Sequence, residues 1–385
     1  MDRAARAAAR FSYGFMQKIV IVYKNKCIFW KHTGEKKPVM KNDDMLTVPA
    51  LSTQRQILMG TAIVLIMFYH CRAVIPGNSI IWYGYAGIKL FCQIGVDIFL
   101  LLSGLGCGYS LAVGGFEEQP VPAARRFWIK RAWRILPKYL LVVAVFCVIN
   151  ALTKETFSWS RVFYQYSLIT FFTRGKLTEW YIAAILVFYL LTPFFYSLLK
   201  TSSVAYWAVV GVIAALTIVI SLSNTSKAFN TVNEIFITRF PVFMTGVALS
   251  QRLNKPEGIL KECTALCLLA VVLVVYVINR LFNSTNEMCV ERLLFWPGSL
   301  LLCLLMANGF EKGKLTGSRF FSFFGTITLE LYLTHEKIRD FYEWSDAYPW
   351  WYGWLFDMAT ILIAICIALL IHGSFAVLDK RRQVQ

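Results

Sequence analysis

Long apolar runs separated by short polar segments constrain the fold of this chain more than any other feature of its sequence. A helix that crosses a bilayer needs about 20 predominantly apolar residues. The runs predict an all-α fold, a polytopic membrane helical bundle with about ten transmembrane helices. We place these helices near residues 56–75, 86–112, 137–152, 178–199, 204–222, 234–251, 263–282, 291–308, 320–336 and 352–378. An aromatic stretch at 157–172 is too short and polar to span, and we expect it to be interfacial or re-entrant.

The composition excludes several classes of protein. Of the 385 residues, 57% are apolar and only 16% are charged, whereas a soluble domain carries about 25% charged residues. This balance excludes a disordered chain, a soluble enzyme and a protein that binds nucleic acid through a basic arm. The net charge of +17 is explained by the Lys and Arg that crowd the cytoplasmic loops of membrane proteins.

Basic residues in alternate loops predict the topology. With the N-terminus inside, the segments at 125–138, 252–261 and 312–319 and the tail at 379–385 are basic inner segments, whereas the outer loops mix acids and bases. The loop at 153–177 is the one basic exception. The positive-inside rule therefore favours ten spans with both termini in the cytoplasm.

Three regions are expected along the chain. Residues 1–54 form a basic extension, 55–378 the transmembrane part, and 379–385 a basic cytoplasmic tail. The extension is either an amphipathic helix on the inner leaflet or an over-long start, with Met45 as the true first residue. Ten cysteines occur without a CxxC pair or a zinc-like Cys/His spacing, so we interpret them as reduced core residues and predict no metal site.

Ionisable residues within membrane spans are costly, and each is a candidate for a functional site. His70 ends the first predicted span and is either a general base for a hydroxyl or an interfacial histidine satisfied by water. Asp97 lies deeper in the second span. It either orients His70, pairs with an arginine, or makes a structural hydrogen bond to another helix.

Four further residues are candidates for a substrate site on the outer side. Glu330 and His335 lie five residues apart near one helix end, where they form either a proton relay or a site for a sugar hydroxyl. Arg239 is a natural ionic partner for either buried acid, and a structural ion pair is the alternative. Trp180 belongs to an aromatic belt or stacks on a sugar ring.

Two basic residues and three glycines suggest further roles. Arg131 and Arg134 are spaced i, i+3 and share a helix face. They suit the phosphates of a cytosolic cofactor or act only as topology anchors. Gly104, Gly106 and Gly108 lie along one span, and we expect them to let helices approach closely.

Six short motifs occur in order along the membrane part of the chain. They are His70 in the first span; GVDIFLLLSG at 95–104; Arg131, Arg134, Ile135 and Pro137; Trp180 with FYLLTP at 188–193; Arg239, Pro241, Phe243 and Gly246; and Gly325, Thr328, Leu329, Tyr332, Leu333 and His335. With these motifs the chain resembles the integral-membrane acyltransferase family 3 over residues 54–378. Members of that family mostly O-acetylate cell-surface glycans.

Two positions depart from the family pattern. The family usually has an arginine eleven residues before the first-span histidine, where this chain has Met59. Arg55 lies one turn earlier and is the candidate substitute, because residues i and i+4 share a helix face. Many members carry a glutamate in the fourth span, where this chain has Ile185.

The resemblance implies an O-acyltransferase in the bacterial cytoplasmic (inner) membrane. The implied donor is cytosolic acetyl-CoA, and the implied acceptor is a hydroxyl of a surface glycan or lipid-linked sugar. The partners are then acyl-CoA, that acceptor and membrane lipid, with no nucleic acid. His70 would be the base, and Asp97 would orient it or hold the site in shape. Arg131, Arg134 and Arg55 would bind the donor, and Arg239, Glu330, His335 and Trp180 would line the acceptor side.

Two other functions use the same features differently. An exporter or flippase of a glycan or lipid-linked intermediate would use the intramembrane charges as gates, although no internal repeat typical of many transporters is visible. A non-catalytic membrane subunit would recruit a partner through the basic N-terminal segment. Only the enzyme requires His70 to change its protonation and the basic pair to bind CoA.

Overall fold

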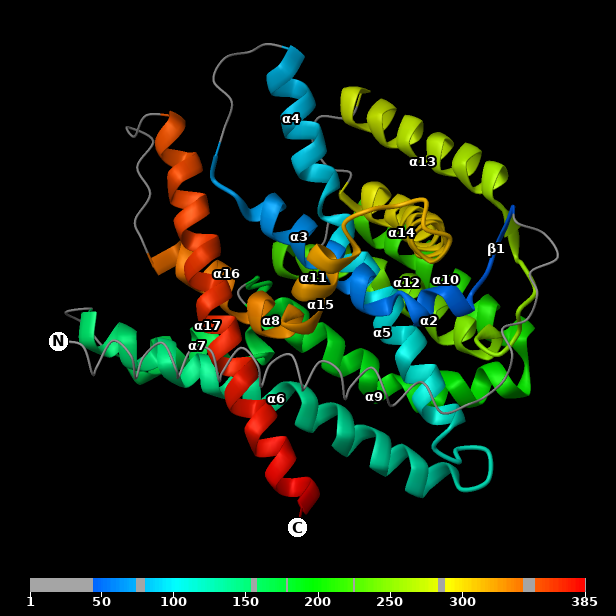
Figure 1. Cartoon of the computed structure of the whole chain (residues 1–385), viewed down its shortest axis with the longest axis horizontal. Helices are drawn as coiled ribbons and strands as arrows, with labels where there is room; N and C mark the ends of the chain where they lie inside the picture. The colour runs from blue at the N-terminus through cyan, green and yellow to red at the C-terminus, as the bar shows by residue number, and fades with distance from the viewer. Residues whose placement is uncertain are drawn as a thin grey trace, which may run out of the picture. The chain divides into compact units, whose positions relative to one another are not determined.

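The computed structural model describes residues 44–73, 80–153, 158–177, 179–223, 226–282, 288–341 and 350–384. Residues 1–43 of the basic extension predicted for residues 1–54 lie outside the described residues. The described elements are β1 (Met45–Leu46), α2 (Pro49–Thr53), α3 (Arg55–His70), α4 (Ile80–Phe91), α5 (Ile94–Ala112), α6 (Pro120–Thr153), α7 (Trp159–Tyr166), α8 (Ile169–Arg174), α9 (Trp180–Thr201), α10 (Ser203–Leu222), α11 (Lys227–Ile235), η1 (Ile237–Arg239), α12 (Phe240–Leu249), η2 (Ser250–Arg252), β2 (Leu260–Lys261), α13 (Glu262–Phe282), α14 (Met288–Glu311), α15 (Ser318–Thr326), α16 (Thr328–Phe341) and α17 (Trp350–Val384). Figure 1 labels most of them.

The prediction of an all-α polytopic bundle is confirmed. In the described residues, eight helices are long and apolar enough to cross a membrane. They coincide with eight of the ten predicted spans and cover Ile81–Ala112, Pro120–Leu152, Trp180–Thr201, Ser203–Leu222, Lys227–Arg252, Glu262–Arg280, Cys289–Glu311 and Trp351–Val377.

The two remaining predicted spans form shorter helices. The first is α3, whose 16 residues cover about 24 Å, less than the hydrocarbon thickness of about 30 Å. The other, predicted at 320–336, is divided into α15 and α16 around Ile327. The Thr328 hydroxyl donates to the carbonyl groups of Phe324 and Gly325, and such side-chain bonds compete with helix continuation.

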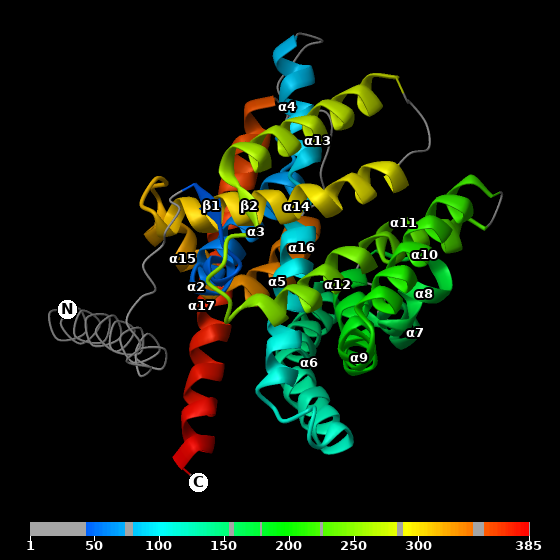
Figure 2. The same ribbon diagram turned by 90° about the vertical axis from the view of Figure 1, so that its right-hand side faces the viewer.

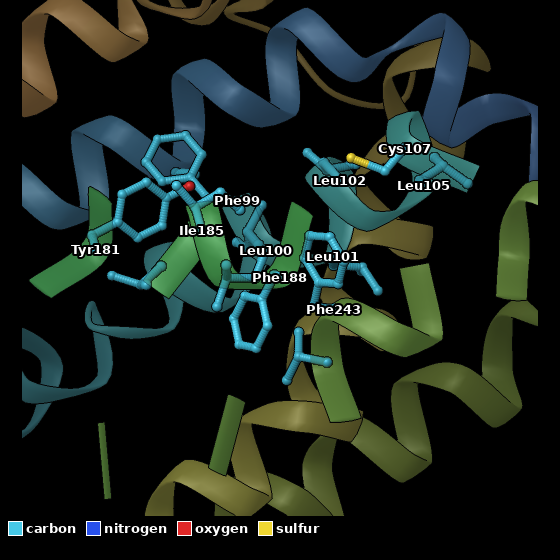
Figure 3. Packing of buried hydrophobic residues seen from close by; sticks show 14 of the residues in the cluster. Phe99, Leu100, Leu101, Leu102, Leu105, Cys107, Tyr181, Ile185, Phe188 and Phe243 are labelled. Carbon is cyan, nitrogen blue, oxygen red and sulfur yellow. The ribbon is translucent and has the colours of Figure 1, made fainter. Parts of the chain in front are cut away.

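Helix α5 lies at the centre of the bundle and packs against α3, α9, α12 and α14. Figure 3 shows its side chains from Phe99 to Cys107 packed against Tyr181, Ile185 and Phe188 of α9 and Phe243 of α12. The apolar stretches of α10, α13 and α17, by contrast, have most of their residues outside the buried interior. In Figure 2, α13 runs beside α14. Apolar side chains on these peripheral helices are therefore available to contact lipid.

Glycines allow the central helices to approach closely. A Cβ atom on Gly104 would lie 2.1 Å from the carbonyl oxygen of Phe243, and one on Gly246 would lie 2.0 Å from that of Leu101. The packing role predicted for Gly104 is thus confirmed, because no side chain fits between α5 and α12. The same holds between α3 and α15, where a Cβ on Gly60 would lie 1.7 Å from the Phe321 carbonyl oxygen.

Polar contacts hold the chain at both ends of α3. After its C-terminal end, Asp357 of α17 accepts hydrogen bonds from the backbone N–H groups of Arg72 and Ala73, at 2.9 and 2.8 Å. Before its N-terminal end, β1 pairs antiparallel with β2, and Asn308 of α14 accepts from the N–H of Thr47 at 3.0 Å. The first and last residues of α3 are therefore positioned by the surrounding helices.

We predict that Gly104→Ala destabilises the protein strongly, because the added methyl group collides with backbone rather than with a mobile side chain. Overpacking of this kind costs about 1–3 kcal/mol or more. Thermal unfolding of the purified protein in detergent measures the effect. The matched control is Gly211→Ala in α10, where a Cβ meets nothing within 4 Å. Equal melting temperatures for the two variants would contradict the packing assignment.

Candidate active site

His70 lies at the C-terminal end of α3 and faces α16. Its Nδ1 atom lies 3.0 Å from Oε1 of Glu336 and 3.0 Å from Nη1 of Arg339. A carboxylate only accepts hydrogen bonds and a guanidinium only donates them, so the two contacts require opposite tautomers of a neutral imidazole. A protonated His70 would donate to Glu336, which therefore stabilises the imidazolium form.

His335 brings a second imidazole to the same place. Its ring centroid lies 5.3 Å from that of His70, and its Nδ1 lies 2.9 Å from the carbonyl oxygen of Leu331. Both histidines line a small pocket between α3, α16 and α17, together with Met67, Cys71, Arg339, Asp357, Thr360 and Ile361. The sequence predictions for His70 and His335 thus fall on neighbouring side chains.

The residues of this pocket offer a possible metal-binding set. One ligand atom each from His70, His335 and Glu336 lies within 4.8 Å of the others, and imidazole and carboxylate are common ligands of transition metals. However, the Arg339 guanidinium places a permanent positive charge 3.0 Å from His70 Nδ1. That charge repels a divalent cation at short range, so the set fits a metal poorly.

Asp97 pairs with Arg239 rather than with His70. Its Oδ1 lies 3.4 Å from Nε of Arg239, and both side chains are almost fully buried. The Arg239 guanidinium also lies over the Trp180 ring, 5.0 Å from its centroid, and donates to the Ile235 carbonyl at 2.6 Å. The alternative of an arginine partner for Asp97 is therefore the one seen in the structure. The Arg239 guanidinium also covers one ring face of Trp180.

Three arginines converge at the opposite end of α3. Arg55 begins this helix, and repulsion from Arg131 and Arg134 of α6 acts on its charge. A Cβ on Gly106 would lie 3.0 Å from the Arg55 guanidinium, and Arg131 donates to the Gly106 carbonyl at 2.7 Å. We call Arg55, Arg131 and Arg134 the arginine cluster. Met59, at the position of the usual family arginine, packs partly buried against the apolar core instead.

The arginine cluster carries an excess of positive charge. No Asp or Glu of the described residues forms an ion pair with any of its three members. Arg131 is buried between the rings of Phe127 and Tyr189, whereas Arg134 is exposed. The Nε atoms of Arg55 and Arg131 are buried without a hydrogen-bond partner among the described residues. This arrangement is suited to an anionic ligand such as a phosphate.

Glu330 lies apart from the His70 pocket. Its carboxylate pairs with Nζ of Lys138 at 2.5 Å and with Nδ1 of His372 at 3.2 Å, which ties α16 to α6 and α17. Glu330 and His335 are separated by about 7.5 Å along their helix. The structure therefore does not bring these two predicted substrate residues together.

Sequence reasoning did not single out Glu336 and Arg339 for this site. The predicted span ends at residue 336, which leaves Glu336 at its edge and Arg339 beyond it, in an outer loop of mixed charge. In the structure α16 continues to Phe341, and this continuation places both residues against His70. A usable signal existed, since His335 and Arg339 are spaced i, i+4 and such residues share a helix face.

We predict that Asp97→Asn mainly lowers stability. The substitution leaves Arg239 buried without its counter-charge, which costs about 3–5 kcal/mol. In a double-mutant cycle followed by thermal unfolding, Asp97→Asn with Arg239→Gln should cost less than the sum of the single variants. The control is Glu117→Gln, whose partner Lys200 is 40% exposed and whose pair contributes less than about 1 kcal/mol. A fully stable but inactive Asp97→Asn protein would instead indicate a role in the chemistry.

Comparison with known proteins identifies the family of this chain. The model of an acyltransferase domain family, Acyl_transf_3, matches residues 57–373. The match covers most of the chain and runs from the first turn of α3 into α17. A search of curated proteins found no match, and a search of solved structures found none. The chain thus belongs to the membrane acyltransferase family 3 and is a multi-pass membrane protein.

Proposed function

We propose that this protein moves an acetyl or other short acyl group from cytosolic acyl-CoA to a hydroxyl of a cell-surface glycan or lipid-linked sugar. Membership of the acyltransferase family supports the reaction type. One observation carries the proposal further. Helix α3 holds Arg55 of the arginine cluster at one end and His70, beside Glu336, at the other.

The arginine cluster would bind the donor. Acyl-CoA carries its phosphates at one end and its reactive thioester at the far end of a pantetheine arm. Arg55 and His70 are the first and last of the 16 residues of α3, so they lie about 22 Å apart along the helix axis, which is comparable to that arm in extended form. Phosphates held by Arg55, Arg131 and Arg134 would therefore leave the thioester near His70.

His70 would act as the general base. With its Nδ1–H directed to Glu336, its Nε2 is free to take the proton of the acceptor hydroxyl. The hydroxyl oxygen then attacks the thioester carbonyl carbon, the carbon–sulfur bond breaks, and the CoA thiolate receives the proton from the imidazolium. The products are an ester and free CoA. Arg339, which lines the pocket, supplies positive charge for the oxyanion of the tetrahedral intermediate.

The proposed donor site at the arginine cluster also implies a membrane orientation. Basic residues accompany the arginine cluster end of α6, at Arg125, Arg126 and Lys130, which is the expected composition of a cytoplasmic segment. We therefore propose a bacterial cytoplasmic membrane protein whose termini lie in the cytoplasm and whose His70 pocket opens toward the outer side. Acetyl-CoA is the proposed soluble donor, and the acceptor approaches from the opposite face.

We predict that His70→Ala lowers acetyl transfer by at least about 100-fold, since a general base contributes about that much or more. Transfer of radiolabel from acetyl-CoA to the glycan or lipid fraction of membranes is the measurement. Glu336→Gln should lower the rate less and should also change its pH profile, because the amide does not stabilise the imidazolium. Glu117→Gln, on the exposed surface, is the matched control.

Equal labelling by wild type and His70→Ala would contradict the proposed enzyme. If the surface polysaccharide were also missing from cells lacking the protein, export of a glycan or lipid-linked intermediate would be the better account.

We predict that Arg134→Ala raises the KM for acetyl-CoA about 10- to 100-fold, because a hydrogen bond to a charged group contributes about 1.5–3 kcal/mol. The KM for acetyl-pantetheine, which lacks the nucleotide and its phosphates, should change little. The matched control is Arg125→Ala, an exposed arginine on the same helix. Equal effects on both donors would place Arg134 outside the phosphate site.

A further inference from the structure

The proton on the neutral His335 ring can be assigned from one contact. Nδ1 of His335 lies 2.9 Å from the carbonyl oxygen of Leu331, and a carbonyl oxygen only accepts hydrogen bonds. The proton must therefore be on Nδ1. In this tautomer Nε2 carries a lone pair and is a hydrogen-bond acceptor.

That acceptor has no partner within the described structure. The His335 side chain is only 4% exposed, and its Nε2 is buried without a hydrogen bond to any described residue. An unsatisfied buried polar group costs about 1–3 kcal/mol. Because the ring lines the same pocket as His70, a ligand in that pocket is well placed to satisfy it.

The spacing of the two rings defines what such a ligand must offer. One nitrogen of His335 lies within 4.8 Å of one nitrogen of His70. Each nitrogen would hold a hydroxyl oxygen at about 2.8 Å, so one small molecule whose two hydroxyl oxygens lie close together can reach both rings at once. The nearby Arg339 guanidinium disfavours a cationic donor such as an ammonium group. Neutral hydroxyl groups on adjacent carbon atoms fit these requirements.

We propose that the acceptor is a vicinal diol. His70 takes the proton from the hydroxyl that becomes acylated, and His335 Nε2 accepts a hydrogen bond from the hydroxyl on the neighbouring carbon. This proposal rests on the proposed function and adds the substrate class to it. It also implies a single acylation per diol, because the product has no second hydroxyl to donate to His335.

The test compares matched acceptors. Purified protein in lipid nanodiscs is given radiolabelled acetyl-CoA with cis- or trans-cyclohexane-1,2-diol, cyclohexane-1,3-diol or cyclohexanol. We expect kcat/KM for at least one 1,2-diol to exceed that for cyclohexanol at least tenfold, with only the monoester formed. The 1,3-diol should behave like cyclohexanol. Equal values for the 1,2-diols and cyclohexanol in wild type would overturn the proposal.

Variants of His335 test the assigned residue. In His335→Leu the ratio of kcat/KM between the 1,2-diol and cyclohexanol should fall to about one, because the side chain no longer accepts a hydrogen bond. His335→Gln, whose amide oxygen is an acceptor, should restore part of the preference. A preserved ratio in His335→Leu would overturn the proposal, whereas a purely structural role would slow both acceptors equally.

The two proposals fail in distinguishable ways. Transfer to alcohols without any preference for a neighbouring hydroxyl would leave the acyltransferase in place and reject the diol. Absence of transfer to every acceptor, including the native membrane fraction, would reject the acyltransferase and the diol together. If His335→Leu does not fold, the wild-type preference between the 1,2-diols and cyclohexanol still decides the question.

Discussion

The need to match charges inside a lipid bilayer determines where the buried ionisable side chains of this protein lie. A buried charge without a partner is strongly unfavourable, and most buried acids of the described residues contact a base from another element. These pairs are Asp97 with Arg239, Glu330 with Lys138, Glu179 with Lys337 and Glu291 with Arg280. Each pair joins two elements, so the same contacts that satisfy the charges also fix the relative positions of the helices.

The arginine cluster stands out against this pattern. Repulsion between Arg55, Arg131 and Arg134 is felt at Arg55, and none of the three arginines forms an ion pair with an Asp or Glu of the described residues. Maintaining like charges at close range is unfavourable unless an anion joins them. The surrounding structure nevertheless holds Arg131 through Gly106 and through two aromatic rings. An excess of positive charge held in a fixed place is what a phosphate-bearing donor requires.

Helix α3 connects this cluster to the chemistry at His70. Close packing through Gly60 leaves it little freedom against α15, and Asp357 holds the chain after its last turn. The pocket at its C-terminal end therefore has a defined geometry, in which two imidazoles, a carboxylate and a guanidinium face one another. Such preorganisation is the main source of electrostatic catalysis in enzymes.

The sequence predicted the helices well and the contacts between them less well. Eight spans follow from apolar runs alone, because length and hydropathy decide membrane insertion. The break between α15 and α16 did not follow, because it depends on hydroxyl groups that bond to local carbonyls. Intramembrane charge identified His70, His335 and Asp97 as candidates. It left the partner of Asp97 open and missed Glu336, because one sequence does not show which faces of distant helices meet.

The most direct test of this account is the sidedness of the reaction. Inside-out membrane vesicles would present the proposed cytoplasmic face, with its arginine cluster, to added radiolabelled acetyl-CoA, which does not cross the bilayer. An oligosaccharide with vicinal hydroxyl groups, which is too polar to cross the bilayer, would be enclosed in the lumen as the acceptor. The account predicts that label reaches the enclosed acceptor and that this transfer requires His70. Transfer only when acetyl-CoA and acceptor share one compartment would contradict the claim that α3 links a donor site on one face to a reaction site on the other.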